Sequence, residues 1–134
     1  MSADSKFLDR LEAGISRAHI STGTTLIVAF SGGPDSSALL AGLVHLGKKR
    51  DFDLVAVHVN HQIRPESSDR DQLTAQKIAA SLNVEFVART VDVPALAAAS
   101  KISIESAARK ARYEALAEIV RKRRAHGVVT GHTR

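Results

Sequence analysis

The 134-residue sequence contains no cysteine. Disulfides, thiolate-bound zinc, iron–sulfur clusters and cysteine persulfide chemistry are therefore excluded for this chain. Tryptophan is also absent, and one tyrosine and four phenylalanines leave little aromatic surface on which nucleic-acid bases could stack. No apolar run approaches the roughly 20 residues that span a bilayer, and the first residues lack the apolar segment of a secretion signal. These absences favour a cytoplasmic protein with no membrane contact.

Basic residues outnumber acidic ones, and the formal net charge is +5. This excess favours an anionic partner, of which nucleic acid is the commonest. Two basic clusters, residues 48–50 and 121–124, lie at the ends of predicted helices. Because cations complement the negative end of a helix dipole, we interpret both clusters as solvated helix ends away from any reacting group. The length suits a single hydrophobic core.

The most informative segment present is SGGPDS, residues 31–36, which follows an apolar run at 26–30 and precedes a helix-like pattern at 37–46. A buried strand, a Gly-Gly turn and a helix N-terminus together form a binding place for phosphate, because free N–H groups and the helix dipole favour an anion. Gly32 and Gly33 have no side chain, so we expect both to take positive φ and to allow close approach of the anion.

Hydroxyl groups strengthen this prediction, since Ser31, Ser36 and Ser37 add possible donors and Pro34 suits the first turn of a helix. The segment lacks the Gly-Lys-Ser/Thr of a Walker loop and the spaced glycines of a dinucleotide-binding fold. An ordinary Gly-Pro turn before a helix is the structural alternative. The segment is therefore predicted to bind phosphate in a manner different from both common nucleotide loops.

Asp35 adds a carboxylate to this loop. A carboxylate beside bound phosphates is repulsive unless a cation lies between them, so Asp35 predicts Mg²⁺ in the loaded site. The alternative is that Asp35 only complements the helix dipole at the N-terminus. We take Asp35 as the candidate metal ligand.

Predicted strands and helices alternate along the chain, which indicates a parallel α/β sheet with helices on both faces. Strands are expected at 24–30, 54–59, 84–87 and 128–131, helices at 35–46, 69–82 and 104–124, a polar loop at 60–68, a helical turn at 94–99, and a first helix around Leu8, Leu11 and Ile15. Because no helix follows the last strand, we expect the chain to be truncated.

Ligands of parallel α/β sheets bind beyond the carboxyl ends of the strands. This rule predicts one cleft formed by the 31–36 loop, the 60–64 loop, Arg89 and His132. In the second loop, we expect Asn60 and His61 to shape the loop and to hydrogen-bond either a nucleotide or the neighbouring backbone. A zinc site is not expected, because the side chains of His58 and His61 do not converge if the strand stays extended.

Arg112 lies within the apolar stripe of the predicted helix 104–124, which is formed by Ile104, Ala108, Ala111, Ala115 and Ile119. An arginine on such a stripe needs a partner or a route to water. Its side chain extends to water, forms an ion pair with Glu105, or points inward at a phosphate or base, and the helical geometry leaves these alternatives open. Arg109 is expected to pair with Glu105 on the surface.

Several segments together resemble a known family. The SGGPDS loop resembles the SGGxDS loop of the N-type ATP pyrophosphatase (PP-loop) superfamily, and the chain is most similar to tRNA(Ile)-lysidine synthases. The further similar segments are HVNHQIR at 58–64, ESAARKARY at 105–113 and the terminal Gly131-His132. The resemblance extends from about Thr24 to the end, and the absence of cysteine argues against the related tRNA thiolases.

The resemblance implies a Rossmann-like ATP pyrophosphatase fold and ATP-dependent ligation of L-lysine to the wobble cytidine of tRNA(Ile). It implies that Asp35, Arg112 and His132 are catalytic, with Asp35 supporting Mg²⁺. The implied ATP-binding residues are Ser31, Gly32, Gly33, Pro34, Asp35, Ser36, Asn60 and His61. A homodimer is left open as a further partner.

The chain departs from this family in its length. Family members are typically at least twice as long and continue past Gly-His into an acidic segment that helps to hold metal and cytidine. Residues 1–134 are therefore expected to be a partial N-terminal catalytic domain without the C-terminal tRNA-binding domains, and to have little or no ligase activity alone. Another PP-loop ligase and a non-catalytic nucleotide-binding module are the alternatives.

Overall fold

The computed structural model describes residues 9–10, 13–14 and 22–129. The elements are β1 (Thr25–Ala29), α2 (Pro34–Arg50), β2 (Asp53–Asn60), α3 (Pro65–Ser81), β3 (Glu85–Thr90), α4 (Val93–Ser100), α5 (Ile104–Arg123) and β4 (Gly127–Val129). Leu8, Leu11 and Ile15, which define the first predicted helix, lie outside the described residues, and so does the end of the last predicted strand. None of the helices described is long and apolar enough to cross a membrane.

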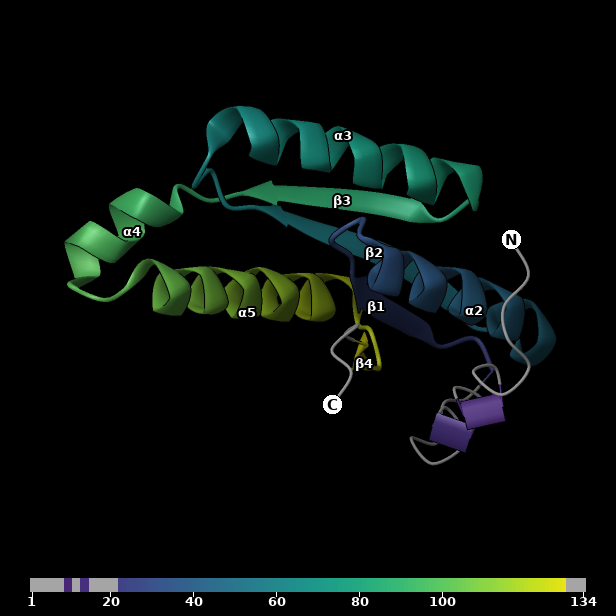
Figure 1. Cartoon of the computed structure of the whole chain (residues 1–134). Coiled ribbons are helices and arrows are strands. Elements are labelled where there is room, and N and C mark those ends of the chain that lie inside the picture. The colour runs from purple at the N-terminus through teal and green to yellow at the C-terminus, as the bar shows by residue number, and fades with distance from the viewer. Residues whose placement is uncertain (1–8, 11–12, 15–21, 130–134) are drawn as a thin grey trace.

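The four strands form one parallel sheet in the order β3-β2-β1-β4 (Figure 1). In the centre of the sheet, Ile27 of β1 is level with Val55 of β2 and Val128 of β4. Val57 of β2 is level with Val87 of β3. Parallel neighbours cannot be joined by a tight hairpin, so helices make the connections between them. The predicted parallel α/β class is confirmed.

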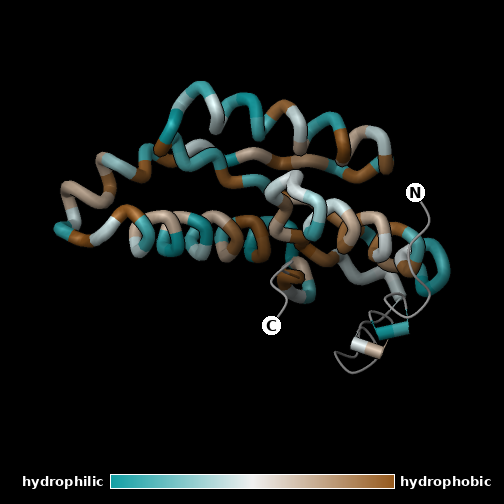
Figure 2. Tube along the Cα trace, in the orientation of Figure 1, coloured by the Kyte–Doolittle hydropathy of each residue, from teal (hydrophilic) through white to brown (hydrophobic). Residues whose placement is uncertain are grey.

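Alternate residues of β1 are buried on opposite faces of the sheet, as the two-residue repeat of a strand requires. Leu26 and Val28 belong to a core cluster that includes α2 and α3 residues, whereas Ile27 packs with Leu116 and Ile119 of α5. Helices therefore cover both faces, as predicted. In Figure 2 the strands are mainly brown, and the helices alternate between brown and teal along their length.

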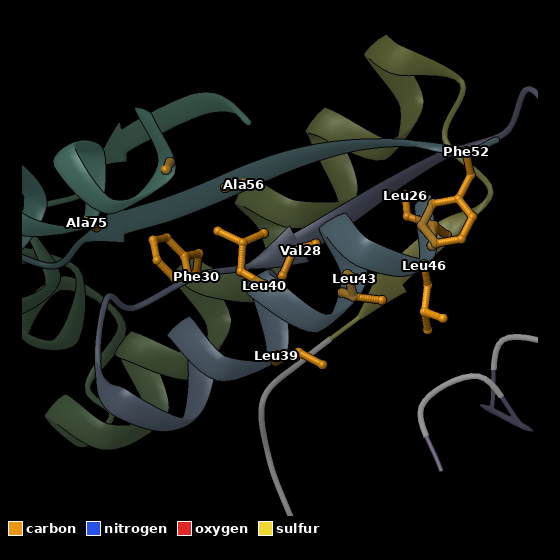
Figure 3. Packing of buried hydrophobic residues seen from close by; sticks show 11 residues of the cluster. Leu26, Val28, Phe30, Leu39, Leu40, Leu43, Leu46, Phe52, Ala56 and Ala75 are labelled. Carbon is orange, nitrogen blue, oxygen red and sulfur yellow. The ribbon is translucent and has the colours of Figure 1, made fainter. Parts of the chain in front are cut away.

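The larger of these two clusters lies between α2 and the sheet (Figure 3). Leu39, Leu40, Leu43 and Leu46 recur at helical spacing along α2 and are all buried with Val28. Fully burying one such leucine side chain contributes about 1.5–3 kcal/mol, so this one helix face fixes α2 firmly on the sheet. Its N-terminus is thereby held at the carboxyl end of β1.

Two predicted helix boundaries are wrong. Helix α2 does not end near Gly47 but continues to Arg50. Gly47 lies inside the helix, where a larger residue would not fit because an added Cβ would lie 2.9 Å from the Phe52 carbonyl oxygen. Helix α3 begins at Pro65, four residues before the predicted start, so the last four residues of the predicted 60–68 loop are helical. Proline at the first helical position is a recognised start signal that the sequence interpretation missed.

The last helices extend beyond the sheet. Helix α4 and the first turns of α5 lie past the carboxyl ends of β2 and β3 (Figure 1). They pack on each other through Val93 and Ala97 of α4 and Ala107 and Ala111 of α5. This small second core holds the N-terminal half of α5 at the edge where the functional loops were predicted.

Candidate functional site

The Ser31–Ser36 loop is held together by its own hydroxyl groups. The hydroxyl oxygens of Ser31 and Ser36 are 3.0 Å apart. The Gly32 N–H donates to Ser36 Oγ at 3.2 Å, and the Gly33 N–H donates to Ser31 Oγ at 3.3 Å. One hydroxyl proton is used between the two serines, so the other is left to donate to a bound anion.

The two glycines of the loop differ in conformation. Gly32 has a φ of +89°, as predicted, and an added Cβ would lie 3.2 Å from both Cα and Cβ of Ala75 in α3. Gly32 is thus needed both for its left-handed backbone and for close packing on α3. Gly33 has φ −75° and ψ 173°, which is extended backbone, so the prediction of positive φ for Gly33 is wrong. It takes the conformation of a helix N-cap instead.

The N-terminus of α2 is open to an acceptor. Pro34 occupies the first turn, and within the described chain no side chain caps the helix. By contrast, the Asp92 side chain accepts from the Ala95 N–H at the start of α4, and the Ser103 side chain caps α5 in the same way. The first N–H groups of a helix have no intrahelical partner, so those of α2 are available for an anion.

A cavity of about 370 Å³ opens at this point, at the carboxyl ends of β1 and β2. Loops and helices on both faces of the sheet contribute to its wall. The lining residues are Ala29, Phe30, Ser31, Asp35, Ser36, Val57, His58, Val59, Asn60, His61, Ser68, Asp71, Arg112 and Leu116. The structure thus brings together Ser31, Asp35, Ser36, Asn60, His61 and Arg112 from the predicted set, while Gly32, Gly33 and Pro34 of the same loop are not among the lining residues. His132 lies outside the described residues.

Two carboxylates, Asp35 of α2 and Asp71 of α3, are on the cavity wall. Among residues 22–129 and the four described before them, no group of three His, Asp or Glu side chains could hold a metal ion unaided. Mg²⁺ commonly takes only one or two carboxylates from the protein and completes its shell with substrate phosphates and water. The donor set therefore fits Mg²⁺ bound together with a phosphorylated ligand.

The two histidines near the end of β2 both use Nδ1 within the protein. The His58 ring is buried, and its Nδ1–H donates to the Phe30 carbonyl oxygen at 2.9 Å. This bond ties β2 to the residue before the Ser31–Ser36 loop. His61 Nδ1 accepts from the Ile63 N–H at 3.2 Å and lies 3.3 Å from Ser68 Oγ. His58 therefore supports the loop, whereas His61 is held against the start of α3.

Arg112 lies on the cavity wall. The buried face of α5 consists of Ala107, Ala111, Ala115, Leu116 and Ile119, rather than the predicted face with Ile104 and Ala108. Ile104 is 40% exposed because the first turn of α5 extends beyond the sheet. Leu116 and Ile119 pack against the strands. Arg112 lies one turn before Leu116 on the same helix, where it lines the cavity and is exposed.

The expected pairs of Glu105 are not observed. No ion pair joins Glu105 to Arg109 or to Arg112 in the part of the chain that the structure describes. All three side chains are exposed on α5. The guanidinium of Arg112 is therefore available to a ligand in the cavity.

Arg89 was expected beside the cleft, and this expectation is wrong. Strand β3 runs to Thr90, and the Arg89 side chain turns to α5, where Nη2 lies 3.4 Å from Glu118 Oε1. Lys122 reaches the same oxygen at 3.3 Å. The hydrogen bond from Lys122, and to a lesser extent that from Arg89, holds the pKa of Glu118 below its ordinary value. Arg89 thus serves the packing of β3 on α5.

Sequence reasoning missed Ser68 and Asp71, both of which line the cavity. They are three residues apart on α3 and share a face with Ala75, against which Gly32 packs. Starting the helix at Pro65 would have placed this face next to the Ser31–Ser36 loop. The available signal was therefore the proline, not the residues themselves.

Comparison with known proteins agrees with this geometry. A family profile described as the PP-loop domain matches residues 4–134. The tRNA(Ile)-lysidine synthase of Clostridioides difficile is 35% identical over 84% of this chain and 24% of that protein. The tRNA(Ile)-lysidine synthase of Thermosipho africanus is 43% identical over 80% of this chain and 25% of that protein. The chain spans about a quarter of the length of these curated relatives.

Solved structures show the same fold at lower identity. A U34-tRNA thiolase from Methanococcus maripaludis, solved with its [4Fe-4S] cluster, has a TM-score of 0.80 at 18% identity, over 96% of this chain and 44% of that one. An NH3-dependent NAD synthetase from Campylobacter jejuni has a TM-score of 0.63 at 19% identity, over 90% of this chain and 52% of that one. With the family profile matching nearly the whole sequence, the chain belongs to the PP-loop domain family.

Proposed function

We propose that the chain binds ATP in the cavity, with the triphosphate on the Ser31–Ser36 loop. The observation that carries this proposal is the N-terminus of α2, which opens on the cavity and has no side-chain cap in the described chain. Phosphate oxygens are the natural acceptors for such N–H groups. The apolar part of the wall, which includes Phe30, Val57 and Leu116, offers a surface for the adenine ring.

We propose that the reaction is the one named in the curated relatives, the formation of lysidine in tRNA(Ile). The 2-carbonyl oxygen of the wobble cytidine in the CAU anticodon attacks the α-phosphate of ATP, which forms an adenylated cytidine and releases pyrophosphate. The lysine amine then displaces AMP at carbon 2. The reaction takes place in the cytoplasm, where ATP and tRNA are both present. The support is 35–43% identity to these synthases across most of this chain.

The residues on the cavity wall match the demands of the first step. The loop N–H groups and the Ser31 and Ser36 hydroxyls hold the leaving pyrophosphate. Asp35 holds Mg²⁺, which when bound neutralises phosphate charge. Arg112 places its positive charge beside the α-phosphate, where negative charge develops during attack. His132, the remaining predicted catalytic group, lies outside the described residues.

Binding of ATP to the 134-residue chain in the presence of Mg²⁺ tests the first part of this proposal by isothermal titration calorimetry. Replacing Arg112 by Ala is expected to weaken ATP binding about tenfold, because a charge-assisted contact to phosphate is lost. Arg109→Ala is the matched control, since it removes the same charge from an exposed position of the same helix that is not among the described cavity residues. Equal losses in both variants, or no binding by the unsubstituted chain, would contradict the proposal.

Release of pyrophosphate with tRNA(Ile) and lysine tests the second part. We expect little or no ligation by these 134 residues, so ATP binding without lysidine formation is the predicted result. Robust modification of tRNA would show that no further segment is needed. Turnover with a different acceptor would favour another PP-loop ligase. ATP binding in this chain, together with an absence of pyrophosphate release in a full-length form, would favour a nucleotide-binding module.

A further inference from the structure

Asn60 has every hydrogen-bonding position of its side chain taken by the protein. Its Nδ2 donates to Asp69 Oδ1 at 3.0 Å and to Gln72 Oε1 at 2.8 Å. Its Oδ1 accepts from the Gln62 backbone N–H at 3.3 Å and from Gln62 Nε2 at 2.6 Å. A primary amide has two donor hydrogens and two acceptor lone pairs. Asn60 therefore has none left for a nucleotide, and only 2% of its surface is exposed.

These bonds fix the loop after β2 against α3. Gln62 has a φ of 55°, a left-handed conformation that is costly for a residue with a side chain. Asn60 Oδ1 accepts a hydrogen bond from the backbone N–H of Gln62, two residues later. This is the hydrogen bond of an Asx turn, which stabilises the left-handed conformation of Gln62. Gln62 Nε2 also donates to Asp69 Oδ1 at 3.0 Å. The Asn60 side chain thus joins the end of β2 to the following loop and to α3.

The loop held in this way carries His61, which lines the cavity. A backbone N–H can only donate, so the bond from Ile63 N–H requires an unprotonated Nδ1 on His61. The hydroxyl of Ser68, 3.3 Å from the same nitrogen, must then also donate. The neutral ring therefore carries its single proton on Nε2.

We propose that Asn60 is a positioning residue, which acts through Gln62 and Asp69 to hold the loop so that His61 presents Nε2–H to the nucleotide. This inference rests on the proposed ATP site. It gives His61 the role of a hydrogen-bond donor to an oxygen of the nucleotide. Of the two roles left open for Asn60 by the sequence, shaping the loop replaces the direct nucleotide contact that the family resemblance implied.

The most direct test changes Gln62, which is not among the described residues of the cavity wall. Gln62→Glu replaces the Nε2 donor by an oxygen that faces two acceptor oxygens, Asn60 Oδ1 and Asp69 Oδ1. We expect ATP binding about tenfold weaker, as for the loss of a part-buried hydrogen bond. Gln76→Glu is the matched control, with the same chemical change at an exposed position of α3. The loss should persist at high salt, where simple charge repulsion is screened.

A second test uses exchange of partners. Asn60→Asp replaces Nδ2 by an oxygen opposite the Asp69 carboxylate, so ATP binding should weaken about tenfold. The double variant Asn60→Asp with Asp69→Asn restores one donor and one acceptor at that contact and should restore most of the affinity. Asp69→Asn alone keeps an acceptor oxygen and should have little effect. Nitrogen NMR of His61 reports the tautomer independently of ATP.

The outcomes separate the possible roles of Asn60. The proposal is supported if Gln62→Glu and Asn60→Asp both weaken ATP binding and disturb the His61 tautomer, and the double variant restores both. It is overturned if the double variant stays weak while the His61 spectrum is unchanged, which is the result expected for direct contact. It is also overturned if the variants lower only the thermal midpoint. If the unsubstituted chain fails to bind ATP, the proposed function fails, but the dependence of the His61 tautomer on Asn60 still tests the network.

Discussion

Helix ends are completed differently on the two sides of the sheet, which we call the amino edge, at the amino ends of the parallel strands, and the carboxyl edge, at their carboxyl ends. At the amino edge, α2 closes with Asp51 in a left-handed conformation, and the Asp51 N–H bonds back to the Gly47 carbonyl. Helix α5 closes in the same manner at Arg124. At the carboxyl edge, Gly33 and Arg64 are the N-cap residues of α2 and α3, and in the described chain neither helix receives a side-chain cap. The amino edge is satisfied internally, whereas the carboxyl edge offers free N–H groups to a ligand.

Cavity size does not distinguish these edges. A second cavity of about 340 Å³ lies at the amino edge, beside Lys48, Asp51 and Asp53. It meets the C-terminal end of α2, where the dipole disfavours an anion. The larger cavity, about 370 Å³, has nearly the same volume but meets the N-terminus of α2. The direction of the helix therefore marks the candidate phosphate site better than volume does.

The largest expected effect comes from Gly32→Ala, which tests the loop of the carboxyl edge. The change combines positive φ with a Cβ 3.2 Å from Ala75, so we expect a stability loss of about 2 kcal/mol or more and at least tenfold weaker ATP binding. Gly23→Ala is the control at the amino edge, because Gly23 has a φ of +81° and no described neighbour within 4 Å of an added Cβ. Urea unfolding and ATP titration should show a smaller stability loss there and unchanged binding. Similar binding losses in both variants would remove the special role of the carboxyl edge.

Gly33→Asp should separate stability from binding, because it supplies the cap that α2 lacks. The backbone of Gly33 is already extended, so an aspartate can accept from the first-turn N–H groups and add a few tenths of a kcal/mol to stability. The same carboxylate would occupy and repel the phosphate position, so ATP binding should fall at least tenfold. Calorimetry and urea unfolding on one sample measure both quantities. Retained ATP binding would show that the triphosphate does not use this helix terminus.

Ser103→Ala should lower stability without changing ATP binding, because Ser103 supplies the side-chain cap of α5. Ser103 Oγ accepts from the Ser106 N–H at 3.0 Å, and its loss should cost about 1 kcal/mol of unfolding free energy. The residue is not among the described cavity residues, so ATP affinity should stay unchanged while the protein remains folded. Parallel loss of ATP binding at full folding would instead link the cap of α5 to the position of Arg112.

The smallest expected effect concerns the amino edge, where Arg123 forms a two-contact ion pair with Glu85. The hydrogen bond from Arg123 lowers the pKa of Glu85 below its ordinary value of 4.5. A carboxyl group whose pKa is lower in the folded protein stabilises it above the unfolded-state pKa, and this contribution is lost as the pH falls through the folded-state pKa. Glu85→Gln should therefore reduce stability slightly at neutral pH, since the pair is half exposed.

The check for this last prediction is urea unfolding of both proteins at neutral pH and well below pH 4.5. The difference between them should shrink in acid, because the unsubstituted protein then also lacks the charged carboxylate. A constant difference at both values of pH would show that Glu85 acts through packing rather than charge. ATP binding should be the same for both proteins at neutral pH.

Local signals in the sequence predicted the regular elements more reliably than their ends. The strand around Ile27 and the leucine repeat of α2 were evident because burial imposes a simple period on each element. Gly47 was misleading, since the sequence does not show that Phe52 packs against it. Pro65 did carry a start signal for α3, and overlooking it concealed Ser68 and Asp71.

Long-range contacts decided which polar residues share the site. Arg89 and Arg112 were both candidates for the site because of their positions in the sequence. In the structure Arg89 pairs with Glu118, whereas Arg112 lines the cavity. The exposed position of Arg112 follows from where α5 passes the end of the sheet, which depends on the packing of α4 on α5. Helical periodicity alone cannot show where a neighbouring sheet stops.

The sequence by itself determined the parallel α/β class, the strand–loop–helix arrangement around residues 31–36 and the resemblance to PP-loop proteins, because each depends on neighbours in the chain. Only the tertiary structure decided that Gly32 packs against Ala75, that Asn60 has its amide fully engaged, and that the two arginines have different partners. These outcomes depend on distances between segments far apart in the sequence. Hydrogen bonds and close packing act over a few ångströms, and the fold alone sets which groups come that near.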